Sequence, residues 1–158
     1  MAFISLDKKV FEDHLSRLRP EDRPQWGSMG PQQMLEHLVR SLRISQGVEK
    51  QSLRIPVEKL EEMQNFLFSE KPMPREVKSA TMVDEDAAYW YEDLEAAKKA
   101  FLEEWDRFCT RYDKDPEKRE VHPVFGELDR KGWEQVHRKH FTHHLQQFGL
   151  LDEEVPGS

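Results

Sequence analysis

Four of the seven histidines in this 158-residue chain fall within eight positions, in the stretch HRKHFTHHLQQFG at 137–149. On a helix with 3.6 residues per turn, His140 and His144 lie on one face, one turn apart, whereas His143 points about 100° away from His144. Imidazoles four residues apart can bind the same divalent ion. This spacing alone is a weak signal, because a catalytic metal site usually has three protein ligands.

A third imidazole is predicted on another helix. The segment QQMLEHLVRSL at 32–42 places Met34, Leu38 and Leu42 on one apolar face, with His37 at the edge of that face. Burying an imidazole without a partner costs about 1–3 kcal/mol, so His37 needs either a hydrogen-bond partner or a metal ion. The pattern of residues leaves both interpretations open.

Two further histidines are weaker candidates. His122 precedes a proline in VHPVFGEL, so its backbone should be extended. We expect His122 to be either a catalytic acid or base at the site entrance or a loop residue that packs its ring on Phe125. His137 is an alternative ligand, one turn before His140.

The loops at 26–29 and 122–126 lead into the two histidine-bearing helices, and we expect both loops to frame the open side of the site.

Nearby polar residues could support the ligands. Gln33 lies one turn before His37, and Gln147 lies three residues after His144. Either amide could orient a ligand from a second layer around the metal, or it could be a solvated amide near a helix end. His14 and His143 are expected to be ordinary histidines on helix surfaces.

The elements that would position these residues are predicted from hydrophobic spacing and from helix-breaking residues. Expected helices span 7–18, 31–45, 57–70, 85–112 and 129–149. Gly30 followed by Pro31 is typical of a helix start, and glycine after a helical stretch is typical of its end. Asp84 or Asp86 is the candidate cap of the long helix. No alternating strand pattern is evident, so the sequence predicts an all-α four-helix bundle with an extra short helix, as a single domain over 1–158 with a frayed tail from about 150.

The composition limits the classes of partner. Charged residues make up 35% of the chain and the formal net charge is −7, so nucleic acid is not an expected partner. No apolar run reaches the roughly 20 residues of a membrane span, and the start MAFISLDKKVFEDH does not resemble a leader. The single cysteine, Cys109, excludes an intrachain disulfide. We therefore expect a cytoplasmic protein that does not bind membranes.

Three stretches together resemble the DinB/YfiT-like superfamily: WGSMGPQQMLEHL, HPVFGELDRKGW and HRKHFTHHLQQFG. The resemblance extends over about residues 15–150 and is to a bacterial branch without assigned activity, with the signature KHxxHHLxQFG. It implies a four-helix bundle with an interior histidine triad, one ligand from the second helix and two from the last. In this sequence those positions are His37, His140 and His144. The implied cofactor is a divalent metal ion, nickel or zinc as in relatives, although three imidazoles also suit iron or copper.

The same resemblance implies a function. Some superfamily members transfer low-molecular-weight thiols or isomerise substrates with a thiol cofactor. This favours a metal-dependent hydrolase or thiol transferase that activates water or a thiol on a small-molecule substrate. The alternatives are a non-catalytic, stress-associated metal-binding protein and a metal-free helical protein with a polar histidine core. Superfamily members often pair through their helices, so a homodimer is also expected.

Overall fold

The computed structural model describes residues 3–75 and 88–152, which form a mostly helical fold with one small antiparallel sheet. The elements are α1 (Lys8–Leu15), α2 (Pro31–Ser45), η1 (Val57–Lys59), α3 (Leu60–Leu67), α4 (Leu94–Lys114), β1 (Glu120–His122), β2 (Gly126–Leu128) and α5 (Arg130–Gln147). The two strands correct the expectation of a purely helical chain. In the part of the chain described, no helix has both the length and the apolar character of a membrane span.

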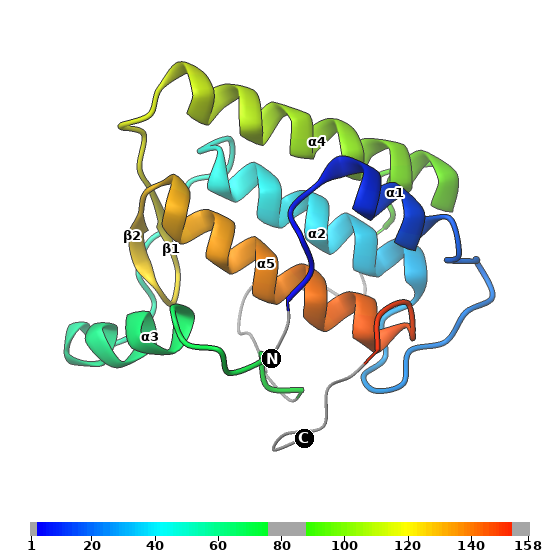
Figure 1. Ribbon diagram of the computed structural model, residues 1–158, viewed down its shortest axis with the longest axis horizontal. Coiled ribbons are helices and arrows are strands. Elements are labelled where there is room, and N and C mark those ends of the chain that lie inside the picture. Colours follow the sequence, from blue (N-terminus) through cyan, green and yellow to red (C-terminus); the bar gives the residue numbers. More distant parts are fainter. Residues whose placement is uncertain (1–2, 76–87, 153–158) are drawn as a thin grey trace.

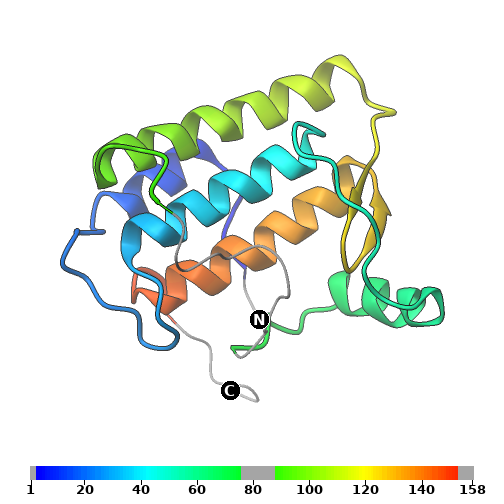
Figure 2. The same ribbon diagram turned by 180° about the vertical axis from the view of Figure 1, so that it is seen from behind.

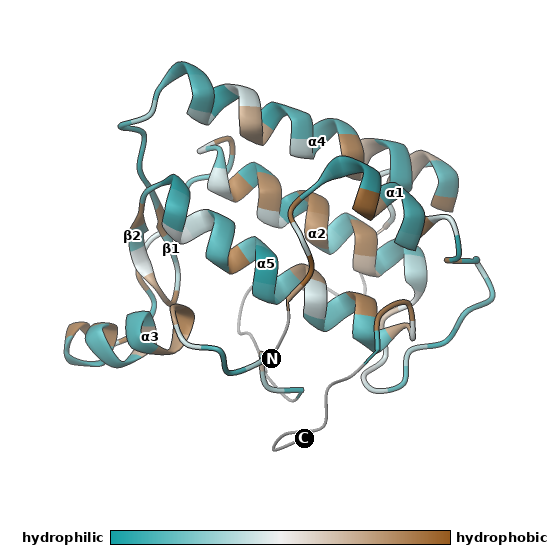
Figure 3. Ribbon diagram, viewed as in Figure 1, coloured by the Kyte–Doolittle hydropathy of each residue, from teal (hydrophilic) through white to brown (hydrophobic). Residues whose placement is uncertain are grey.

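Helix α2 lies between α4 and α5 in both views of the molecule (Figures 1 and 2). The helices α2 and α4 run in the same direction and α5 runs in the opposite direction (Figure 1). Hydrophilic residues follow the outer side of α4, while apolar residues lie on the sides that the helices turn toward one another (Figure 3). Phe11 of α1 completes this core, with ring centroids 5.2 Å from Trp105 of α4 and 5.5 Å from Phe141 of α5.

Several predicted helix boundaries are confirmed. Gly30 caps α2 and Pro31 is its first residue, where the missing proline N–H has no helical partner to lose. Asp129 caps α5 by accepting a hydrogen bond from the backbone N–H of Gly132 at 3.0 Å. Gly47 follows α2 with a φ of 80°, the left-handed conformation that glycine adopts without strain.

The long helix begins later than expected. Asp93, not Asp84 or Asp86, is the observed cap of α4, and its carboxylate accepts from the backbone N–H of Ala96 at 2.8 Å. Asp84 and Asp86, like all of 76–87, lie outside the described residues. Residues 88–93 are not helical, and Tyr89, expected on the apolar face of the helix, is 56% exposed.

A buried carboxylate explains why the chain before α4 is not helical. Glu36 of α2 accepts from the backbone N–H groups of Trp90 at 2.7 Å and Tyr91 at 3.4 Å. The side chain of Gln32 donates to the carbonyl of Tyr91 at 2.8 Å. Because side chains of α2 take up these backbone groups, residues 90–91 are held against α2 in a non-helical conformation.

A hairpin precedes α5. Strands β1 and β2 pair antiparallel, with His122 opposite Gly126. The Nδ1 atom of His122 accepts from the backbone N–H groups of Val124 at 3.0 Å and Phe125 at 3.2 Å, so the imidazole closes the turn. Strands of three residues are too short to show a clear alternation of apolar and polar residues, and the sequence pattern did not reveal them.

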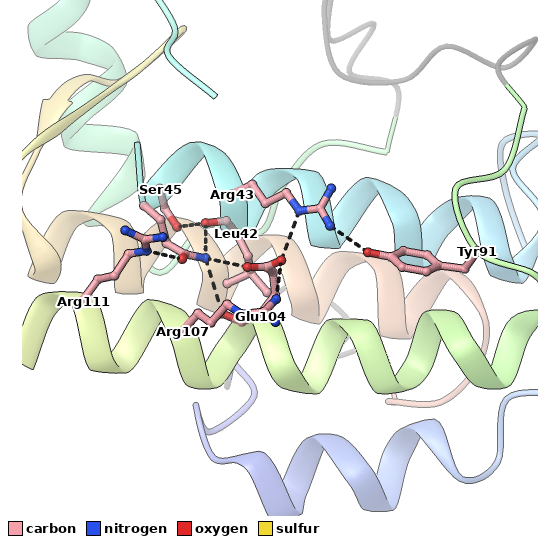
Figure 4. Close-up of polar contacts among 8 residues, drawn as sticks. Leu42, Arg43, Ser45, Tyr91, Glu104, Arg107 and Arg111 are labelled. Carbon is pink, nitrogen blue, oxygen red and sulfur yellow. Dashed lines mark hydrogen bonds and ion pairs between the residues drawn. The ribbon is translucent and has the colours of Figure 1, made fainter. Parts of the chain in front are cut away.

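A buried ion network fixes α2 on α4 (Figure 4). Glu104 of α4 is 4% exposed, and its carboxylate accepts from Arg43 Nε at 3.1 Å, Gln46 Nε2 at 3.2 Å and Arg107 Nη1 at 3.2 Å. Arg43 also donates to the Tyr91 hydroxyl at 2.8 Å. The network thereby holds in place the helix that carries His37.

Candidate metal centre

Three histidines from two helices meet in the interior. The ring centroid of His37 on α2 lies 4.7 Å from that of His140 and 5.0 Å from that of His144, both on α5. One ring nitrogen from each lies within 4.8 Å of the others, and all three side chains are buried. The structure thus brings together the three residues that the sequence singled out as ligands, because α2 and α5 lie side by side (Figures 1 and 2).

Hydrogen bonds define the protonation of these rings. The Nε2 atoms of His37 and His140 are 2.8 Å apart, so one of them donates to the other. His144 uses its other nitrogen, Nδ1, in a 2.8 Å contact with Oε1 of Gln147. An amide oxygen only accepts, so the proton of His144 lies on Nδ1 and the lone pair lies on Nε2.

The donor set fits a divalent first-row metal ion. Metal–nitrogen bonds of about 2.0–2.1 Å in a tetrahedral arrangement place two ligand nitrogens about 3.3 Å apart. The 2.8 Å separation of His37 and His140 would therefore open by about half an ångström, a change that side-chain rotation supplies. Neutral imidazoles suit zinc, nickel, copper and iron.

Burial keeps the ligands in the form that binds metals. The pKa of His140 is lowered well below its usual value, first by burial and then by the neighbouring His37 and His144. Burial also lowers the pKa of His144 well below its usual value, although the hydrogen bond with Gln147 acts in the opposite direction. Both imidazoles are therefore neutral at pH 7, with a lone pair that can bind an ion.

His137 lies outside this cluster. It is fully buried, and its Nε2 is 2.9 Å from Oγ of Ser45. Because that hydroxyl donates to the carbonyl of Leu42 at 2.7 Å, it accepts the proton of His137 Nε2. The His137 ring is stacked between Trp133 and Phe141, with centroids at 5.8 and 5.2 Å. The structure therefore places His137 in the apolar core, between α2 and α5.

His122 lies at the hairpin. Its ring packs on Phe125, with centroids 4.7 Å apart, and on Trp133 at 5.4 Å. Burial lowers its pKa to about 3. The packing on Phe125 that the sequence allowed is thus observed, while a catalytic role for His122 stays a prediction.

Of the two loops expected to frame the site, only the one before α2 lies beside the end of α5 that carries His144. The 122–126 hairpin lies at the start of α5, whereas the loop before α2 lies near the end of α5 (Figure 1). The 122–126 hairpin precedes α5, and the 26–29 loop precedes α2. Because α2 and α5 are antiparallel, the starts of the two helices are at opposite ends of the pair. Trp26 of the loop before α2 contacts His143 of α5, with ring centroids 5.4 Å apart.

The structure corrects the expectation for one residue beside the cluster and decides between the two that were left open for another. His143, expected on the surface, is only partly exposed, and burial lowers its pKa to about 4. Gln147 is 4% exposed and contacts His144, so it is not a solvated amide. Its place in the terminal QQFG of α5, three residues after His144, was the one available signal. Gln33 is half-buried.

These features define a mostly helical protein with a buried cluster of three histidines between two antiparallel helices. The chain matches the family described as "Protein of unknown function (DUF1569)" over residues 1–149, and it belongs to that family. Comparison with curated proteins and with solved structures found no match.

Proposed function

We propose that this protein is a DinB-like four-helix-bundle metalloenzyme that binds a divalent ion through His37, His140 and His144. The ion, zinc or nickel, activates water or a low-molecular-weight thiol for reaction with a small-molecule substrate. The observation that carries the proposal is the convergence of three buried imidazoles from segments 103 residues apart in the chain.

The cost of burying these rings supports a ligand role. Taking an imidazole out of water costs free energy that an apolar side chain in the same interior space would not cost. Three imidazoles from two helices nevertheless converge here, with one nitrogen of each within 4.8 Å of the others. A metal ion bound by all three would offset this cost.

The type of ligand favours catalysis over a purely structural role. Catalytic zinc sites usually have three protein ligands, often histidines, and keep one position for water or substrate, whereas structural sites usually have four ligands, often cysteines. Cys109 lies on α4 and burial raises its pKa, so it is a thiol at neutral pH. An ion held by neutral ligands keeps its full charge and polarises the oxygen or sulfur atom bound to it.

The proposal is tested by loading the metal-free protein with cobalt(II) and recording its visible absorption during titration with azide and with a small thiol. We expect both additions to change the spectrum, because each replaces a ligand at an exchangeable position. His37→Ala should lose the cobalt bands. A wild-type spectrum that neither addition changes would favour a non-catalytic metal-binding protein, in which the ion only joins α2 to α5.

A further inference from the structure

We infer that Gln147 is a positioning residue that fixes the proton of His144 on Nδ1 and couples the metal centre to residues 25–27. The part of this inference that concerns the ion rests on the proposed function. The part that concerns the tautomer and the loop rests on hydrogen bonds that form without an ion.

The orientation of the Gln147 amide follows from its partners. Nε2 of Gln147 donates to the backbone carbonyl of Trp26 at 2.8 Å, and a carbonyl only accepts. Oε1 therefore faces Nδ1 of His144, at 2.8 Å, and must accept. The Trp26 carbonyl thus sets the direction of the whole chain of hydrogen bonds, and it leaves the lone pair of His144 on Nε2.

This support matters because of where His144 lies. Gln147 is the last residue of α5, so His144 lies in the final turn, where helices fray. Partners that orient a metal-bound histidine through its second nitrogen typically change metal affinity by about 10–100-fold when they are removed. Gln147 supplies this partner from the same helix.

The loop before α2 contacts both the backbone and the side chain of Gln147. The backbone N–H of Gln25 donates to the carbonyl of Gln147 at 2.7 Å. Gly27 has a φ of 78°, and a Cβ atom there would lie 3.0 Å from Nε2 of Gln147. Gly27 thus allows both the left-handed turn and the close approach of the amide. Because coupling between sites is reciprocal, an ion that orders His144 also stabilises this loop.

The first test compares Gln147→Leu with the matched control Gln146→Leu. Gln146 lies in the same last turn and is also buried, but its amide donates to the carbonyl of Asp152. Zinc affinity is measured by competition with a chromophoric chelator, and the tautomer of His144 by long-range nitrogen–proton correlation NMR of the metal-free protein. We expect Gln147→Leu to weaken zinc binding by about 10–100-fold and to lose the defined Nδ1–H tautomer, with Gln146→Leu close to wild type.

Two further variants separate the two contacts of the amide. Gln147→Glu keeps an acceptor for His144 but loses the donor to Trp26, so zinc affinity should be retained while amide exchange at Gln25 becomes faster. Gly27→Ala changes no ligand but displaces the amide, so zinc binding should weaken. Both variants also serve if Gln147→Leu fails to fold.

The outcomes separate this inference from the proposed function. Wild-type protein that binds no zinc but holds His144 as the Nδ1–H tautomer would contradict the proposed function and leave the role of Gln147 in the tautomer intact. Zinc binding that is equal in wild type and Gln147→Leu, with the same tautomer in both, would overturn the inference and leave the proposed function standing.

Discussion

At the residue scale, burial sets the charge of the histidines. Burial lowers the pKa of His122 and His137 to about 3 and that of His143 to about 4. In the unfolded chain the same groups titrate near pH 6.5. As the pH falls below 6.5, the unfolded chain therefore takes up protons that the folded chain does not. The free energy of unfolding must decrease through this window, and the loss levels off only near the folded pKa values.

His122→Asn tests this linkage at one residue. The asparagine Oδ1 can replace Nδ1 as the acceptor for Val124 and Phe125 but does not titrate near neutral pH. One histidine that stays neutral when folded costs about 2 kcal/mol of stability between pH 7 and pH 5. We expect urea denaturation at pH 7, 6 and 5 to show a loss for His122→Asn that is smaller than the wild-type loss by about this amount. An unchanged loss would mean that His122 takes up its proton over the same pH range in the folded protein as in the unfolded chain.

The sequence predicted the three candidate ligands but left most of their surroundings open. Spacing along one helix predicts that His140 and His144 share a face, because helix geometry is local. The contact between Gln147 and Trp26 joins residues 121 positions apart. Such contacts depend on how a loop packs against a helix end, which the pattern of either segment alone does not determine. His143 was misassigned for the same reason, since its ring packs against Trp26 from another segment of the chain.

At the element scale, the ion network of Glu104 links α2 to α4 (Figure 4). The carboxylate is buried, whereas Arg40 and Glu49 form a bidentate pair that remains partly exposed. Removing one partner of a buried network leaves charged or polar groups unpaired in the interior. Removing one partner of an exposed pair leaves the other to be solvated by water.

Glu104→Ala should therefore lower the free energy of unfolding by about 3 kcal/mol. The matched control Glu49→Ala should lower it by about 0–1 kcal/mol. Both values come from urea denaturation at pH 7 in the presence of a chelator, so that metal binding does not contribute. Equal losses in the two variants would show that the network does not stabilise the contact between α2 and α4.

Element boundaries were predicted where one residue type decides them. Gly30 with Pro31 and Asp129 mark helix starts by their own backbone or side-chain chemistry. The start of α4 depends in addition on Glu36, a residue of α2 that holds the backbone of Trp90. His122 closes the turn of the hairpin with its side chain, and no alternation of apolar residues predicts this contact.

At the scale of the whole molecule, the histidine cluster joins two long helices that are far apart in the chain. An ion that binds only the folded protein stabilises it by RT ln(1 + [L]/Kd), about 3–4 kcal/mol at 100 to 1,000 times Kd. Zinc should therefore raise the melting temperature of the chelator-treated protein, and His140→Ala should abolish the rise. The control His14→Gln should keep it, because His14 contacts the carbonyl of Leu150 and lies outside the cluster. A melting temperature that zinc does not change would show that the ion does not bind the folded protein in preference to the unfolded chain.

The most direct test of the account is the metal content of the untagged protein, purified without a metal-affinity column and analysed by mass spectrometry of its elements. We predict about one equivalent of zinc or nickel per chain in the wild type and in His14→Gln, and near-complete loss in His37→Ala, since a site with two imidazoles rarely holds a divalent ion tightly. Wild-type protein without a stoichiometric divalent ion, even after incubation with zinc and nickel, would contradict the claim that His37, His140 and His144 form a metal centre. The same metal content in wild type and His37→Ala would contradict it as well.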